Sequence, residues 1–247
     1  MSGHSKWATI KRKKAATDAK RGKLFTRLLR EIQVSAKLGG ALEGNARLRT
    51  AVQAARSVSV PGDNIDRAVK RGLGQLDGAD YEEVAYEAYG PGGVAILVKT
   101  LTDNRNRTVG ELRSILARHG GSMAGVNSVA YLFTDRGSIA VQKGAIEEDA
   151  LLALALEAGA DDLVDEGDRW VVQTDLKSFD GVRAAVQSRV QDAEAALAPV
   201  ASTSVPVAGK DAEILLKLLD ALDDLDDVQN VYANFDIDDG ELGRLSA

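Results

Sequence analysis

The Lys and Arg side chains of this sequence are concentrated near its N-terminus, where they could bind phosphate. Residues 1–75 hold 17 Lys and Arg against 5 Asp and Glu, whereas the other 172 residues hold 14 against 32. Arginine and lysine are the usual protein ligands of phosphate oxygens. A one-signed basic segment beside an acidic remainder predicts that a polyanion such as nucleic acid binds at the N-terminal end. A highly charged, solvated helical bundle is the alternative interpretation.

The candidate phosphate ligands form an arm followed by a helical stripe. In residues 20–37 the apolar side chains recur with helical spacing on one side and the cations fall on the other. Residues 5–21, the arm, offer little to bury apart from Trp7 and Ile10. We expect the following side chains to contact phosphates: Lys6, Lys11, Arg12, Lys13, Lys14, Lys20, Lys23, Arg27 and Arg30.

A second candidate surface lies further along the chain. Arg105 and Arg107 stand between a predicted strand and a predicted helix, whose N-terminus favours anions. The loop at residues 120–127 follows the end of that helix and completes the predicted surface. The alternative is that both arginines pair with carboxylates of the protein while the residues before them shape a turn. The sequence leaves both interpretations open.

No other set of side chains carries comparable chemistry. His4 and His119 are the only histidines and lack neighbouring ligands at metal spacing, and the chain has no cysteine. The aspartates between residues 220 and 239 lack the glycine and final glutamate of a calcium loop, so we interpret them as a solvated face. No nucleophile stands beside a base. We therefore expect no enzyme activity, no metal, no cofactor and no small-molecule substrate.

The elements that position these side chains begin with helices and continue with strands. At 247 residues the chain is long enough for two or three domains. No apolar run approaches the roughly 20 residues of a membrane span, so we expect a cytoplasmic protein without a membrane partner. The elements expected before residue 135 are a helix at 20–37, a helix capped by Asn45, a helix with Pro61 in its first turn, strands at 84–89 and 94–101, a helix with Thr108 and Glu111 as its capping box, and a strand at 128–134.

The middle of the chain predicts a unit complete in itself. The order β-α-β-β-α-β is that of a ferredoxin-like fold. Its expected parts are a strand at 138–142, a helix at 147–158, a hairpin of 162–165 with 169–174, a helix at 179–190 and a strand within 195–205. One more helix, at 210–222, and one more strand, at 228–235, follow. We therefore predict an α+β multidomain protein with a basic helical domain (1–76), an α+β domain (77–135 plus 207–247) and an inserted ferredoxin-like domain (136–206).

Several runs of residues are those of a known family. They are residues 3–8 (GHSKWA), 18–26 (DAKRGKLFT), 45–49 (NARLR), 61–65 (PGDNI) and 101–108 (LTDNRNRT). With them the chain closely resembles the YebC/PmpR family, whose mitochondrial relative is the translational activator of cytochrome c oxidase. Two departures are Thr9, where Asn is common, and Asn127, where Gly usually stands. Because Asn tolerates positive φ, we expect the turn at residue 127 to survive.

The resemblance implies a three-domain, cytoplasmic regulator linked to nucleic acid. Such proteins are commonly described as transcriptional regulators that bind DNA, with translation as the other reported role. The alternative is therefore a translation factor that binds ribosomal RNA or the ribosome. Charge does not choose between the two, because both ligands present phosphate. The sequence has no helix-turn-helix with base-reading side chains gathered at a helix N-terminus, and it leaves the oligomeric state open.

Overall fold

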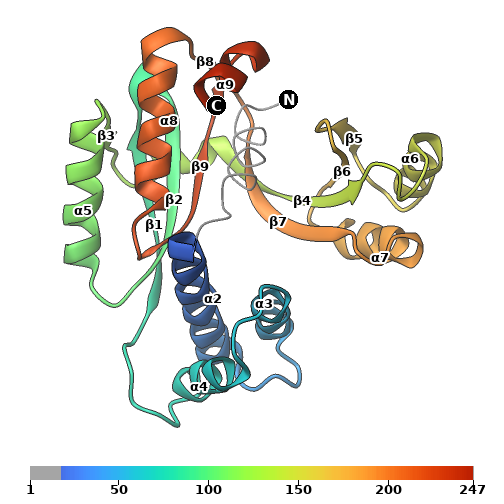
Figure 1. The fold of residues 1–247 in the computed structure, drawn as a ribbon, viewed down its shortest axis with the longest axis horizontal. Coiled ribbons are helices and arrows are strands. Elements are labelled where there is room, and N and C mark those ends of the chain that lie inside the picture. Colours follow the sequence, from blue (N-terminus) through green and yellow to red (C-terminus); the bar gives the residue numbers. More distant parts are fainter. Residues whose placement is uncertain (1–17, 247) are drawn as a thin grey trace.

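Three helices form the N-terminal part of the described chain, hereafter the head. The computed structural model describes residues 18–246, without the side chains of residues 18–21, 239 and 246. The helices are α2 (Asp18–Gly39), α3 (Ala46–Ser57) and α4 (Gly62–Gly72) (Figure 1). Ile32, Leu48 and Ile65 pack together in a core of their own. Asn45 caps α3 as predicted, because its side chain accepts a hydrogen bond of 3.0 Å from the N–H of Leu48.

The first sheet takes its strands from two distant parts of the chain. In spatial order they are β3 (Ser122–Met123), β1 (Glu82–Tyr89), β2 (Ala95–Thr102) and β9 (Val228–Ala233). Two helices, α5 (Arg105–Arg118) and α8 (Gly209–Asp223), lie together on one face of this sheet (Figure 1). In the β1–β2 pairing Glu82 lies opposite Thr102, so the start of β1 stands beside the end of β2.

The second sheet is built from one continuous segment. Its strands, in spatial order, are β5 (Asp162–Asp165), β6 (Arg169–Thr174), β4 (Phe133–Gln142) and β7 (Glu194–Ala201). The helices α6 (Glu148–Glu157) and α7 (Phe179–Arg189) pack on it around Ile139, Val172 and Val182. The chain order β4-α6-β5-β6-α7-β7 and this antiparallel strand order are those of a split βαβ unit.

Short elements complete the chain. They are the 3₁₀ turns η1 (Pro91–Gly93) and η2 (Ala130–Leu132), the strands β8 (Val205–Pro206) and β10 (Phe235–Asp236), which pair in parallel, and helix α9 (Asp239–Ser246). The mixed α+β fold predicted from the sequence is confirmed. The limits of the three predicted domains stay predictions.

Two local predictions are wrong. Residues 128–132 form turns rather than a strand, and β4 runs without a break from Phe133 to Gln142. Helix α5 begins three residues earlier than the predicted capping box, because Asn104 caps it by accepting a hydrogen bond from the N–H of Arg107. Thr108 is a buried residue inside the helix. Its hydroxyl has a different partner, described below.

Gly137→Ala is expected to destabilise the protein through the packing of α7 on β4. A Cβ at residue 137 would lie 2.3 Å from Cδ2 of Phe179 and 2.6 Å from Cγ2 of Thr174, both of them buried side chains. Overpacking of this kind costs about 1 to 3 kcal/mol of unfolding free energy, measurable by urea denaturation. The matched control is Gly110→Ala in α5, where a Cβ meets nothing within 4 Å. The control should gain about 0.5 to 1 kcal/mol; a loss at both positions would contradict this packing.

Candidate nucleic-acid interface

The cationic side of α2 lies against the turn that joins α8 to β9. Arg27 Nη1 is 3.3 Å from both carboxylate oxygens of Asp223, and Arg27 Nη2 donates to the main-chain oxygen of the same residue. Lys23 Nζ donates to the main-chain oxygen of Asp224 at 2.9 Å and lies 3.4 Å from its carboxylate. Two of the predicted phosphate ligands therefore bind carboxylates and carbonyls of the protein itself.

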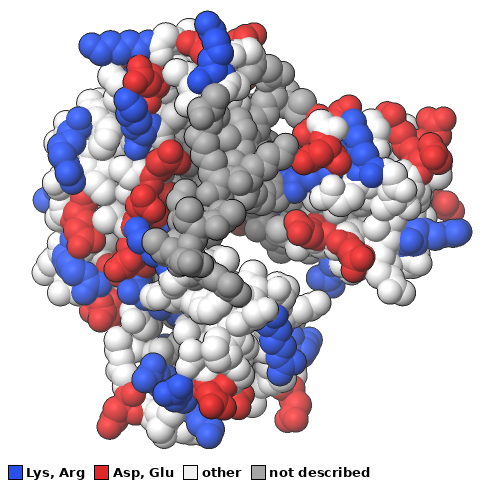
Figure 2. Space-filling model, in the orientation of Figure 1, with Lys and Arg blue, Asp and Glu red and all other residues white. Residues whose placement is uncertain are grey.

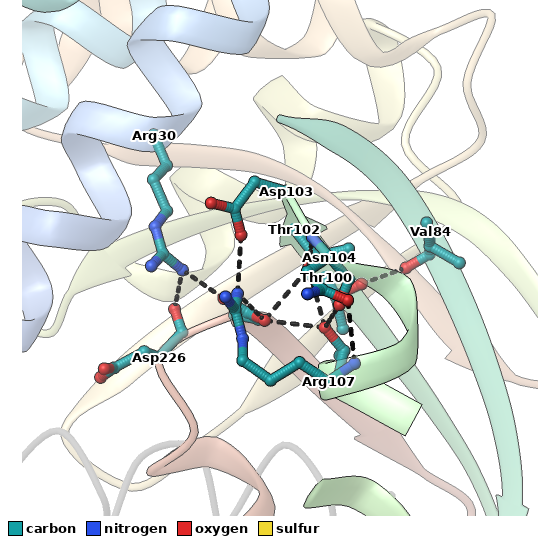
Figure 3. Close-up of polar contacts among 10 residues, drawn as sticks. Arg30, Val84, Thr100, Thr102, Asp103, Asn104, Arg107 and Asp226 are labelled. Carbon is teal, nitrogen blue, oxygen red and sulfur yellow. Dashed lines mark hydrogen bonds and ion pairs between the residues drawn. The ribbon is translucent and has the colours of Figure 1, made fainter. Parts of the chain in front are cut away.

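Arg30, one turn further along α2, reaches deepest into this contact. Its Nη1 lies 3.0 Å from Oδ1 of Asp227 and donates to the main-chain oxygen of Asp226 (Figure 3). Its guanidinium also stacks over the ring of Tyr81, with 5.0 Å from Cζ to the centroid. The Arg30 side chain is only 14% exposed. The guanidinium of Arg30 is therefore already largely removed from water in the folded protein.

The carboxylate of Asp227 is the centre of a polar network. It is 1% exposed and accepts hydrogen bonds from Arg107 Nη2 at 2.8 Å, Thr108 Oγ1 at 2.7 Å and Thr102 Oγ1 at 3.1 Å. Burial raises the pKa of Asp227, but the bonds from Arg107 and Thr108 and the charges of Arg107 and Arg30 outweigh it. The pKa is therefore held below its ordinary value, and the group is ionised at neutral pH.

The turn between β2 and α5 places both predicted arginines of the part that follows the head, hereafter the body (residues 77–246). Thr102 Oγ1 accepts from the N–H of Asn104 at 2.9 Å, and Asn104 caps the helix, which aims Arg107 at Asp227 and at Asp103, 2.8 Å away (Figure 3). Arg105 instead forms a two-bond fork with the carboxylate of Glu82, at 2.5 and 2.6 Å. The paired geometry is the one that the alternative interpretation expected, and phosphate binding by these arginines stays a prediction.

Five of the predicted phosphate ligands lie among the described side chains, and all five form ion pairs. They are Lys23, Arg27, Arg30, Arg105 and Arg107. The others lie outside the described side chains: Lys6, Lys11, Arg12, Lys13, Lys14 and Lys20. The interpretation of the aspartates after residue 220 as a solvated face is wrong for Asp223 and Asp227, which are 8% and 1% exposed. Their burial follows from the arginines that reach them from α2 and α5.

The helices α3 and α4 carry exposed cations that sequence reasoning did not select. Arg49, Arg56, Lys70 and Arg71 are exposed, and none of them forms an ion pair within the described part of the chain. The signal was present in the sequence, since α3 has three arginines and no acid. On α4, however, Asp63 and Asp66 alternate with the cations. The face of the molecule in Figure 2 accordingly shows both signs of charge on the head.

A second buried carboxylate holds the loop at residues 120–127. Glu87 accepts from the N–H groups of Asn127, Val129 and Ala130 at 2.6, 2.6 and 2.8 Å. Burial raises the pKa of Glu87, but these backbone hydrogen bonds together lower it by more than burial raises it. The net shift of the pKa is therefore downward. Asn127 has φ of 63°, as the expectation of a surviving turn requires. The loop is therefore fixed from inside, while Val126 is 89% exposed.

The described side chains include no group of three His, Asp or Glu placed to hold a metal ion. None of the helices described is at once long and apolar enough to cross a membrane.

The fold and its charged surfaces define a mixed α+β protein with a cation-rich helical head. Residues 5–75 match the family model described as the TACO1/YebC protein N-terminal domain. Residues 81–235 match the family model described as the TACO1/YebC second and third domain. The chain belongs to this family, as its sequence motifs predicted.

Related proteins align over almost their whole length. The chain is 50% identical to a "probable transcriptional regulatory protein" of Koribacter versatilis, with all of both chains covered. It is 54% identical to a protein of the same name from Gemmatimonas aurantiaca, with 98% of this chain and 99% of the relative covered. The crystal structure of a conserved hypothetical protein from Aquifex aeolicus is similar, with a TM-score of 0.81 at 40% identity, over 90% of this chain and 93% of that one.

Asp227→Asn is expected to lower the unfolding free energy by about 3 kcal/mol at pH 7, because it leaves Arg30 and Arg107 without the buried negative charge. A carboxylate with a lowered pKa stabilises the fold above its unfolded pKa of about 3.9, and this stabilisation is lost as pH falls through the folded pKa. Urea denaturation between pH 3 and pH 7 should therefore show that the unfolding free energy falls less with falling pH in the variant than in the wild type. Parallel curves would mean that Asp227 is not ionised in the fold. Asp226→Asn, in the same turn, is the control and should follow the wild type.

Proposed function

We propose that this protein is a non-enzymatic regulator of gene expression that binds nucleic acid through its basic N-terminal domain, with DNA as the ligand. The observation that carries the proposal is the charge of residues 1–75, where 17 Lys and Arg stand against 5 Asp and Glu. The relatives named as probable transcriptional regulatory proteins support the regulatory role. A cytoplasmic location and the absence of a small-molecule substrate belong to the same proposal.

The proposed contacts divide between the arm, the stripe and the body. The arm supplies Lys6, Lys11, Arg12, Lys13, Lys14 and Lys20, and the stripe supplies Lys23, Arg27 and Arg30. The body supplies Arg105 and Arg107 as a second surface, which RNA rather than a duplex would use. We also propose the three-domain division at residues 1–76, 77–135 plus 207–247, and 136–206. In this division each domain contains one of the three buried apolar clusters of the described chain.

Ribosomal RNA is the second candidate ligand, and Arg105 is the observation that favours it. Its side chain is 61% exposed on the body, and its Glu82 partner is 43% exposed. Exposed pairs of this kind contribute only about 0 to 1 kcal/mol to stability, so phosphate can replace the carboxylate at low cost. A duplex held by the head has no need of this site. RNA that approaches from several directions could use both surfaces.

Neutralising the arm tests the electrostatic basis of the proposal. Lys11, Lys13 and Lys14, all replaced by Gln, should weaken duplex DNA binding and reduce the salt dependence, because about three fewer counterions are released. The wild type, if it neutralises about six phosphates, should show a slope of log affinity against log salt near −5. The matched control replaces Lys177, Arg189 and Lys210 by Gln, an equal charge change on exposed body positions. Tight binding with a slope near zero, or equal losses in both variants, would contradict the proposal.

Arg105→Ala distinguishes the two ligands. On the DNA proposal the variant should bind a duplex as the wild type does and co-sediment with ribosomes no differently. If ribosomal RNA is the ligand, ribosome association should fall while duplex binding is unchanged, since a charge-assisted phosphate contact contributes about 1.5 to 3 kcal/mol. Glu82→Gln removes the same ion pair but keeps the cation, and is the control. Equal losses in Arg105→Ala and Glu82→Gln would assign the effect to the fold.

A further inference from the structure

The cationic side of α2 is occupied by the acidic turn, which we define as residues 223–227. Three cations at positions 23, 27 and 30 stand on one side of the helix and meet three carboxylates of the turn, those of Asp223, Asp224 and Asp227. The paired residues are about 200 positions apart in the chain. The stripe is therefore bound to an anionic surface that the same chain provides.

The acidic turn presents the same chemistry as a phosphate backbone. Arginine binds carboxylate and phosphate with the same planar fork of N–H donors. The turn also lies at the C-terminal end of α8, whose last carbonyls carry the negative end of the helix dipole. Arg27 and Lys23 use these carbonyls as well as the carboxylates. A phosphate and this turn cannot occupy the same guanidinium donors at once.

Among the described residues, charged and polar side chains of the head bind the body. The apolar cluster of the head runs from Phe25 to Leu73 and shares no residue with the cluster of the first sheet. Besides the acidic turn, the head is held by Arg47 bound to Glu83 and by Lys37 bound to Asp80. Polar interfaces of this kind separate more readily than a shared hydrophobic core, and salt screens their exposed pairs.

We propose that the acidic turn is an internal competitor of nucleic-acid phosphate for the stripe on α2. The inference rests on the proposed function and adds its regulation. In the docked arrangement the protein meets nucleic acid with its other cations, while Arg27 and Arg30 are held by the turn. When α2 leaves the turn, the full stripe becomes available for phosphate. The free energy needed to break the ion pairs that hold the head therefore reduces the binding free energy for nucleic acid.

Asp223→Asn tests the competition with a single change. It removes the charge that faces Arg27 but leaves the main-chain carbonyl bond in place. The matched control is Asp226→Asn, because the exposed carboxylate of Asp226 forms no ion pair among the described residues and points away from Arg30 (Figure 3). Both variants change the net charge equally. A difference between them therefore reports the ion pair rather than the general field.

The measurement is the affinity of full-length protein for a fluorescent 20-base-pair DNA duplex and for a single-stranded RNA of equal length, at several salt concentrations. Asp223→Asn should bind about threefold to tenfold more tightly than Asp226→Asn, as the loss of one largely buried pair permits. Its slope of log affinity against log salt should be steeper by about one, because one more cation meets phosphate. Asp224→Asn, an exposed position that pairs with Lys23, should change affinity in the same direction by less.

The possible results separate the inference from the function. If the wild type binds and Asp223→Asn binds no more tightly than Asp226→Asn, the competition is refuted and the proposed function stands. If neither the wild type nor any variant binds either oligonucleotide, both fail. If thermal melting shows that Asp223→Asn is destabilised, Asp224→Asn is compared with Asp226→Asn instead. The competition is then refuted if Asp224→Asn binds no more tightly than Asp226→Asn.

Discussion

The buried charge of Asp227 is the constraint on which the arrangement of this protein depends. A carboxylate taken out of water is stable only when its oxygens are fully hydrogen-bonded and its charge is paired. Asp227 meets this condition with groups from three places: Arg30 on α2, Arg107 and Thr108 on α5, and Thr102 at the end of β2. Its main-chain oxygen also accepts from Leu101 at 2.8 Å. One residue thereby fixes the position of the head, the start of α5 and the edge of the first sheet together.

The same constraint changes what the charge asymmetry of the sequence means. Counted along the chain, the body is an acidic surface that should repel nucleic acid. In the structure, several of its acids do not face solvent: Asp223 and Asp227 neutralise arginines of the head, and Glu87 is turned inward to hold a loop. The outward field of the body is therefore weaker than the count of carboxylates suggests, and that of the head is weaker too. The described surface still presents the exposed cations of α3 and α4 and the exposed fork of Arg105.

Features that depend on neighbouring residues were predictable from the sequence, and features that depend on distant ones were not. Asn45 as a cap and the hairpin of β5 and β6 follow from local rules, and the structure has both where they were expected. Thr108 matched the local rule for a capping box, yet its hydroxyl is 2.7 Å from Asp227, which is 119 positions away. The stripe on α2 was likewise correct as a pattern, but its partners lie about 200 positions further on. Amphipathic spacing shows that cations share a face and does not show what that face meets.

Glu87 extends the argument from the head to the loop at residues 120–127. Like Asp227, it is a buried acid whose pKa is lowered although burial alone would raise it, and like Asp227 it organises a segment that the sequence marked as a contact surface. Asp227 bonds to Thr102, which pairs with the first residue of β1, whereas Glu87 lies near the last residue of that strand. The first carboxylate aims arginines and the second fixes backbone N–H groups. Because these groups are held before any ligand arrives, binding at either surface does not have to order them first. What binding must overcome instead is the pairing already present, which is strong at Arg30 and Arg107 and weak at Arg105.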